Sequence, residues 1–173
     1  NRKTLSYPKV RTFIRQKYSE VIQEKFGKVD VIAGVATGGI AQGALVAQEL
    51  DLPFIYVRSS SKGHGLQNQV EGVVEAGQRV VVIEDLISTG MSSLKAVEAL
   101  RAIDCQVVGM VAIFTYDFEL AQNNFKEYNC PLYTLSDYNH LIDEALRMGY
   151  INQSDDEALK NWRKDPANWK VLV

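Results

Sequence analysis

Two neighbouring acids, followed by a short run of hydroxyls and glycine, are the residues in this sequence best suited to do chemistry. Glu84 and Asp85 follow the apolar run of residues 80–83 in the stretch VVVIEDLISTGMSS, residues 80–93. Where the small residues 88–92 turn into a helix N-terminus, free backbone N–H groups, hydroxyls and the positive helix dipole can surround one anion. The pattern predicts a cradle for a phosphate monoester.

The two carboxylates would suit a ribose next to that phosphate, because they accept hydrogen bonds from vicinal hydroxyls, directly or through a hard cation. The sequence contains neither the GxxxxGK[ST] loop nor a GxGxxG motif, so the two common nucleotide-binding loops are excluded. A plain strand end with a helix cap is the structural alternative for these residues.

Two further polar segments follow predicted strands. Thr37, Gly38 and Gly39 form a tight turn whose amides could face an anion. Arg58, with Lys62 and His64 in the loop of residues 59–68, offers cations, although such a stretch is often only a solvated loop. Ligands of open parallel sheets bind at the carboxyl ends of the strands, so we expect these segments to converge with the acids.

The elements that must position these residues alternate between helix and strand. Apolar spacing predicts helices over residues 6–27, 39–50, 92–103, 118–128 and 136–147, and strands over 31–35, 54–58, 79–83, 106–114 and 132–134. Residues 70–74 and 79–83 flank a turn and predict a hairpin, and SDDE at 154–157 predicts a capping box that opens a last helix. The alternation is typical of a mostly parallel sheet covered on both faces.

Composition limits the function classes. The chain has 173 residues, 46% of them hydrophobic, and a formal net charge of −2. This predicts one domain over residues 1–173 and argues against nucleic-acid binding over the whole surface. Cys105 and Cys130 lack metal or disulfide spacing, so we expect reduced thiols in a cytoplasmic protein, and no run is apolar enough for a membrane span. The chain starts at Asn1 rather than methionine, so an N-terminal segment is expected before it.

Together these segments resemble the type I phosphoribosyltransferases, in the branch that uses orotate. VVVIEDLISTGMSS resembles the phosphoribosyl-pyrophosphate motif, and YVRSSSKGHGLQNQVEG at residues 56–72 resembles the mobile catalytic loop. The match extends to NRKTLSYPKVR, GVATGGIAQGALVA, IFTYDF and LSDYNHLI. The resemblance implies that family's α/β fold, with a mostly parallel central sheet flanked by helices, a mobile loop hairpin and an N-terminal hood segment.

The resemblance also implies an activity, in which the ribose 5-phosphate of phosphoribosyl pyrophosphate passes to orotate, giving orotidine 5'-monophosphate and pyrophosphate for UMP synthesis. It implies Mg²⁺ carried by the substrate, with Glu84 and Asp85 as candidate ligands, and a homodimer with shared active sites. Lys62, His64 and Asp85 would be catalytic, Thr37, Gly38 and Gly39 the pyrophosphate loop, and Ser88 a contact to orotate. The remaining contacts to phosphoribosyl pyrophosphate would be Arg58, Glu84, Leu86, Ile87, Thr89, Gly90, Met91 and Ser92, together with Lys62, His64, Asp85 and Ser88.

Two other functions stay open from the residues. A purine or xanthine phosphoribosyltransferase would share the cradle and the acids. A regulator of nucleotide genes could bind phosphoribosyl pyrophosphate as a signal, although the acidic pI of about 5.7 argues against it. Phe118 stands where some family members carry an arginine that contacts the orotate carboxylate, so base recognition would depend on Ser88, backbone amides and the segment expected before Asn1.

Overall fold

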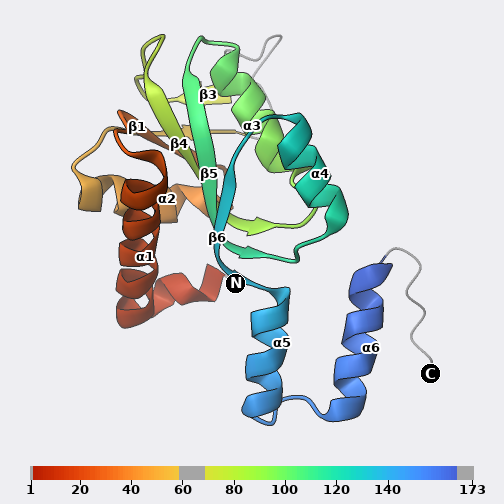
Figure 1. The fold of residues 1–173 in the computed structure, drawn as a ribbon. Helices are drawn as coiled ribbons and strands as arrows, with labels where there is room; N and C mark the ends of the chain where they lie inside the picture. The colour runs from red at the N-terminus through yellow and green to blue at the C-terminus, as the bar shows by residue number, and fades with distance from the viewer. Residues whose placement is uncertain (1, 59–68, 167–173) are drawn as a thin grey trace.

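The computed structural model describes residues 2–58 and 69–166 of the protein (Figure 1). Its strands form one sheet in the order β3-β2-β1-β4-β5-β6. Neighbours from β2 to β6 run parallel, and β3 is an antiparallel edge. The elements are η1 (Arg2–Ser6), α1 (Pro8–Phe26), β1 (Val31–Val35), α2 (Gly38–Leu50), β2 (Phe54–Val57), β3 (Val70–Glu71), β4 (Arg79–Ile87), α3 (Met91–Arg101), β5 (Gln106–Thr115), α4 (Glu119–Glu127), β6 (Leu132–Asp137), α5 (Tyr138–Arg147) and α6 (Gln153–Lys164).

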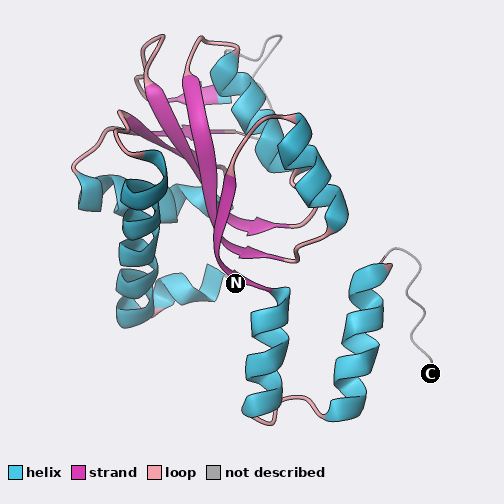
Figure 2. Cartoon of the chain, viewed as in Figure 1, coloured by secondary structure: helices cyan, strands magenta, loops and turns pink. Residues whose placement is uncertain are grey.

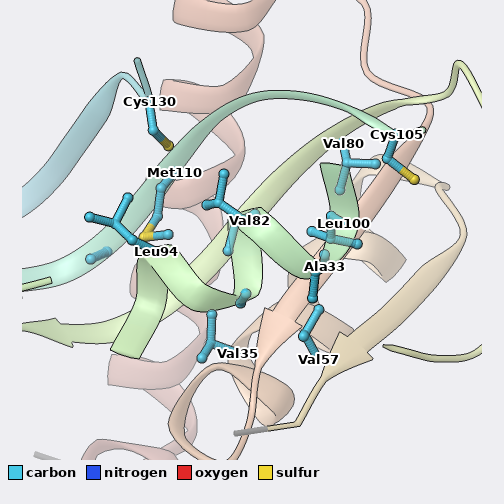
Figure 3. Close-up of a cluster of buried hydrophobic side chains, with 14 of the residues drawn as sticks. Ala33, Val35, Val57, Val80, Val82, Leu94, Leu100, Cys105, Met110 and Cys130 are labelled. Atoms are coloured by element: carbon cyan, nitrogen blue, oxygen red, sulfur yellow. The ribbon is translucent and has the colours of Figure 1, made fainter. Parts of the chain in front are cut away.

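Helices cover both faces of the sheet (Figures 1 and 2). Side chains of α1 and α2 pack with Ile32, Val81 and Ile83, whereas those of α3 and α4 pack with Val80 and Val82 on the opposite face (Figure 3). Alternate residues of one apolar run thus enter different cores, which is why the central strands are apolar throughout. The predicted mostly parallel sheet flanked by helices is confirmed. Both cysteines are free and buried.

Strand β4 is longer than the sequence suggested. The prediction ended it at Ile83 and placed a loop from Glu84, but pairing with β5 continues through Leu86 and Ile87. That boundary was wrong because the charged pair weakens the apolar signal, while the long neighbour β5 supplies hydrogen-bond partners as far as Thr115. The two acids therefore lie on a rigid strand rather than a loop.

The predicted hairpin between residues 70–74 and 79–83 is wrong. Strand β3 pairs antiparallel with β2, matching Tyr56 with Glu71, whereas β4 lies between β1 and β5. A strand with both faces buried gains more in the middle of the sheet than beside a two-residue edge strand. The connection over residues 72–78 therefore crosses from the edge of the sheet to its centre.

The C-terminal helices also begin at other residues than expected. Strand β6 continues through Asp137, which caps α5 by accepting a hydrogen bond from the His140 N–H. Helix α6 begins at Gln153, and its capping box joins Asn152 and Asp155 rather than starting at Ser154. The two helices form a hairpin beyond the end of β6 (Figure 1). Among the described helices, none is both long and apolar enough to cross a membrane.

Candidate functional site

The carboxyl ends of β1 and β4 and the start of α3 enclose a pocket of about 340 Å³. This is the edge of the sheet at which the sequence predicted its polar segments to meet. The pocket is lined by nine of the predicted residues, namely Thr37, Gly38, Glu84, Asp85, Leu86, Ser88, Thr89, Gly90 and Ser92. Segments about 50 residues apart in the chain therefore form one site.

Other predicted residues lie outside this lining. Ile87 is fully buried in the core, so only its backbone could serve a ligand, and Met91 is 38% exposed at the first residue of α3. Arg58 directly follows β2, where its Nη1 lies 3.3 Å from Oε1 of Glu71. Lys62 and His64, with the rest of the predicted mobile loop, lie outside the described residues.

Glu84 is held inward by its neighbours. Its Oε1 accepts a hydrogen bond from the Asp85 N–H at 2.8 Å, and its Oε2 accepts one from the Ser93 hydroxyl at 2.9 Å. The buried Tyr18 on α1 donates its hydroxyl to the Glu84 carbonyl at 2.6 Å. Burial, together with the adjacent Asp85, raises the pKa of Glu84 to about 7. The buried position therefore favours the protonated form of Glu84 more than water does.

Asp85 faces the pocket instead. Its side chain is 18% exposed, and its Oδ2 accepts a hydrogen bond from Nε of Arg2 at 2.8 Å. A carboxylate has about four lone-pair positions, so one bond from Arg2 leaves others for a sugar hydroxyl. The two acids are therefore not equivalent, since Glu84 is engaged internally and Asp85 presents its charge to a ligand.

The start of α3 has the form expected of an anion cradle. Gly90 is its N-cap residue with a φ of 80°, and no side chain of the described residues caps the helix. The first backbone N–H groups of α3 can therefore donate hydrogen bonds to a ligand, at the positive end of the helix dipole. The preceding turn is fixed because Asn124 on α4 donates to the Thr89 carbonyl at 2.9 Å.

The glycine pair after β1 packs tightly against β4. A Cβ at Gly38 would lie 2.4 Å from the Asp85 carboxylate, and a Cβ at Gly39 would lie 2.2 Å from the Ile83 carbonyl oxygen. The Ala36–Thr37 peptide bond that enters this turn is cis. A side chain is thus excluded at Gly39 by the backbone, and one at Gly38 would displace the Asp85 carboxylate. The turn brings its backbone directly beside the acid.

Sequence reasoning missed four residues that shape this site. Arg2 bonds to Asp85, Ser93 and Tyr18 bond to Glu84, and Asn124 bonds to the cradle turn. Three of them come from other elements, up to 83 residues away in the chain. Only Ser93 could have been found from nearby sequence, because it is the last residue of the motif VVVIEDLISTGMSS that contains both acids.

An aromatic pocket of about 640 Å³ adjoins the cradle and shares Ser88 and Thr89 with it. The ring of Phe118 stacks on Tyr116 with centroids 5.4 Å apart, and Trp162 of α6 meets both rings edge-on. This wall can accept a planar group beside the start of α3. A larger cavity of about 750 Å³ between α4, α5 and α6 is lined by none of the predicted site residues.

Comparison with known proteins gives one consistent result. Residues 3–143 match the phosphoribosyl transferase domain. The orotate phosphoribosyltransferase of Phocaeicola vulgatus is 61% identical over 171 residues, which are 99% of this chain and 81% of that protein.

Solved structures agree with this result. The crystal structure of orotate phosphoribosyltransferase from Aeropyrum pernix is similar with a TM-score of 0.76 and 28% identity, covering 87% of this chain and 82% of that one. The Leishmania donovani UMP synthase structure has a TM-score of 0.80 at 23% identity, covering 94% of this chain and 34% of that one, and therefore supports the fold alone.

Proposed function

The chain belongs to the phosphoribosyltransferase family, with orotate phosphoribosyltransferases among its close relatives, and from this we propose that it transfers ribose 5-phosphate from phosphoribosyl pyrophosphate to orotate. The products are orotidine 5'-monophosphate and pyrophosphate. The observation that carries this function is the pocket that joins the acid pair, the glycine pair and the start of α3. In our proposal the acid pair binds the ribose, the glycine pair the pyrophosphate and the start of α3 the phosphate monoester.

The reaction breaks the bond between C1 of the ribose and the pyrophosphate oxygen, which leaves with the electron pair. A new bond forms between C1 and N1 of orotate, and the N1 proton is lost. Positive charge develops on the ribose and negative charge on the leaving group, so electrostatic stabilisation and positioning dominate catalysis. In our proposal Asp85 binds the ribose hydroxyls and stabilises this ring, and the amides of residues 88–92 hold the 5'-phosphate.

The leaving pyrophosphate lies, in this proposal, against the backbone of Thr37, Gly38 and Gly39. Arg58, Lys62 and His64 supply the positive charge, with Lys62 and His64 on a loop that closes over bound substrate. Support for the loop roles comes from the sequence resemblance, since residues 59–68 are outside the described part of the chain.

We propose Mg²⁺ as the cofactor, bound mainly by substrate oxygens. Among the described residues, no group of three or more histidine, cysteine, aspartate or glutamate side chains could hold a metal ion. Asp85, with Glu84 behind it, fits the one or two carboxylates by which Mg²⁺ is usually held beside phosphates. The ion would neutralise charge on the leaving group.

Orotate is proposed to lie between the ribose position and the aromatic wall of Tyr116, Phe118 and Trp162, with Ser88 as a hydrogen-bond partner. The adjoining position of this wall and Ser88 supports the placement. The identity of the base follows from the relatives rather than from the pocket, because a planar purine could also stack on aromatic rings.

The function is tested by the decay of orotate absorbance. We expect decay that requires both phosphoribosyl pyrophosphate and Mg²⁺, with pyrophosphate released in equal amount. Adenine and xanthine serve as alternative acceptors, and an electrophoretic shift assay with pyrimidine-gene RNA and DNA tests the regulator. Turnover of a purine but not of orotate, or nucleic-acid binding without turnover, would contradict the proposal.

We further propose a homodimer with shared active sites, in the cytoplasm. A surface suited to self-association lies at the start of α1, where Tyr7, Val10 and Phe13 are 61%, 43% and 59% exposed. The free buried thiols Cys105 and Cys130 fit a reducing compartment.

A further inference from the structure

Arg2, near the N-terminus of the chain, also lines the site. It lies in η1, lines the same pocket as the acid pair, and donates from Nε to Oδ2 of Asp85 at 2.8 Å. Its side chain is 61% exposed, so this ion pair contributes little to folding. A contact that adds little stability but lies in the pocket is better explained by ligand binding.

The bond from Arg2 uses only one of the three guanidinium nitrogens. Within residues 2–58 and 69–166, the two terminal nitrogens donate to no other group. Nε is fixed by Asp85, so these terminal N–H groups form an anchored fork. Such a fork matches the oxygens of a phosphate and can bind two of them at once.

The position of Asp85 indicates which phosphate the fork would meet. The Asp85 carboxylate fills the space that a side chain at Gly38 would need, at 2.4 Å from an ideal Cβ. Arg2, which is bonded to that carboxylate, therefore lies on the side of the pocket formed by Thr37 and Gly38. The cradle at the start of α3 has its own donors in backbone N–H groups.

We propose that Arg2 is a pyrophosphate-binding residue, anchored through Nε to Asp85 and binding anionic oxygens through its terminal nitrogens. This inference rests on the proposed function. It adds a cation beside the turn of Thr37, Gly38 and Gly39, which has no charged side chain of its own. Arg2 would thereby connect Asp85, which binds the ribose in our proposal, to the leaving pyrophosphate.

The test is equilibrium binding by calorimetry, with Mg²⁺ present and no base. Arg2→Ala is expected to weaken binding of inorganic pyrophosphate by about 10- to 100-fold, as expected for charge-assisted hydrogen bonds. Binding of ribose 5-phosphate should change by less than about twofold, because that phosphate is held by backbone donors. Arg2→Lys should fall between the wild type and Arg2→Ala, since it keeps the charge and loses the fork.

The matched control is Arg147→Ala, which removes an exposed arginine paired with Glu144 on α5 and should leave both affinities unchanged. The melting temperature of Arg2→Ala should match that of the wild type. Unchanged pyrophosphate affinity, an equal loss for both ligands, or a wild type that binds no pyrophosphate would each overturn the proposal. Because no base is present, failure of orotate turnover would be a separate result that concerns the proposed function alone.

Discussion

A side chain added at Gly38 would contact a different group from one added at Gly39. We therefore expect substitution of Gly38 to affect catalysis and substitution of Gly39 to affect stability. A methyl group at Gly38 meets the Asp85 carboxylate, which can rotate, whereas one at Gly39 meets the backbone carbonyl of Ile83, which cannot. Gly38→Ala should therefore fold and lose on the order of tenfold or more in kcat/KM, because the acid is displaced. Gly39→Ala should lose about 1–3 kcal/mol of stability.

Urea unfolding and steady-state kinetics on both variants measure this difference. The two glycines serve as controls for each other, since they are adjacent and both are buried. Equal effects of the two substitutions on activity and on stability would show that the close approach to Asp85 has no special role.

Glu84 makes the free energy of unfolding depend on pH, and a single substitution can remove this dependence. Its pKa is raised from 4.5 to about 7 by burial, so between these values the folded protein holds a proton that the unfolded chain has released. The contribution to stability is full below pH 4.5 and is lost as the pH rises through about 7. The total is on the order of 3 kcal/mol, from about 2.5 pKa units at about 1.4 kcal/mol each.

Urea unfolding at pH 5 and pH 7.5 should therefore show a larger loss for the wild type than for Glu84→Gln, which cannot titrate. Glu157→Gln, at an exposed position on α6, is the control and should follow the wild type. Parallel curves for the wild type and Glu84→Gln would mean that Glu84 stays ionised in the folded state.

At the scale of elements, α1 supports the acid-bearing strand through one hydroxyl. Tyr18 is fully buried and donates to the Glu84 carbonyl at 2.6 Å. Tyr18→Phe leaves that carbonyl buried without this donor, which should cost about 1–3 kcal/mol. We also expect a lower kcat, because the end of β4 positions Asp85.

Thermal unfolding and kinetics test this role. Tyr150→Phe removes the same hydroxyl from an exposed tyrosine outside the proposed dimer surface and should change stability by less than about 0.5 kcal/mol. If Tyr18→Phe behaves like the Tyr150 variant, α1 only covers the sheet and does not position the acid.

At the scale of the whole molecule, the proposed shared site predicts complementation between subunits. Lys62→Ala and Asp85→Asn should each be inactive alone. If the loop of one subunit closes over the acids of its partner, a hybrid dimer contains one intact site and one with both lesions, and recovers up to about half the wild-type activity.

The measurement is orotate turnover after subunit exchange, with hybrid formation confirmed by native mass spectrometry. Each variant mixed with itself is the control. A mixture that stays inactive despite confirmed exchange would show that the loop acts within its own chain.

The sequence by itself determined the parts of this protein that depend on local pattern. The apolar runs of β1, β4 and β5 predicted strands buried on both faces, and the small residues after Ile87 predicted the start of α3. Because the carboxyl ends of parallel strands meet at one edge, the convergence of Thr37, Gly38 and the acid pair followed from the order of the elements. The resemblance to phosphoribosyltransferases depended on the same short motifs.

Only the tertiary structure decided which partners these residues have. The pairing of β3 with β2 depends on the relative burial of whole strands, which no local turn signal contains. The inward position of Glu84 and the outward position of Asp85 depend on Ser93, Tyr18 and Arg2. Two of these residues lie 66 and 83 positions away along the chain, and hydrogen bonds and burial act through space rather than along the sequence.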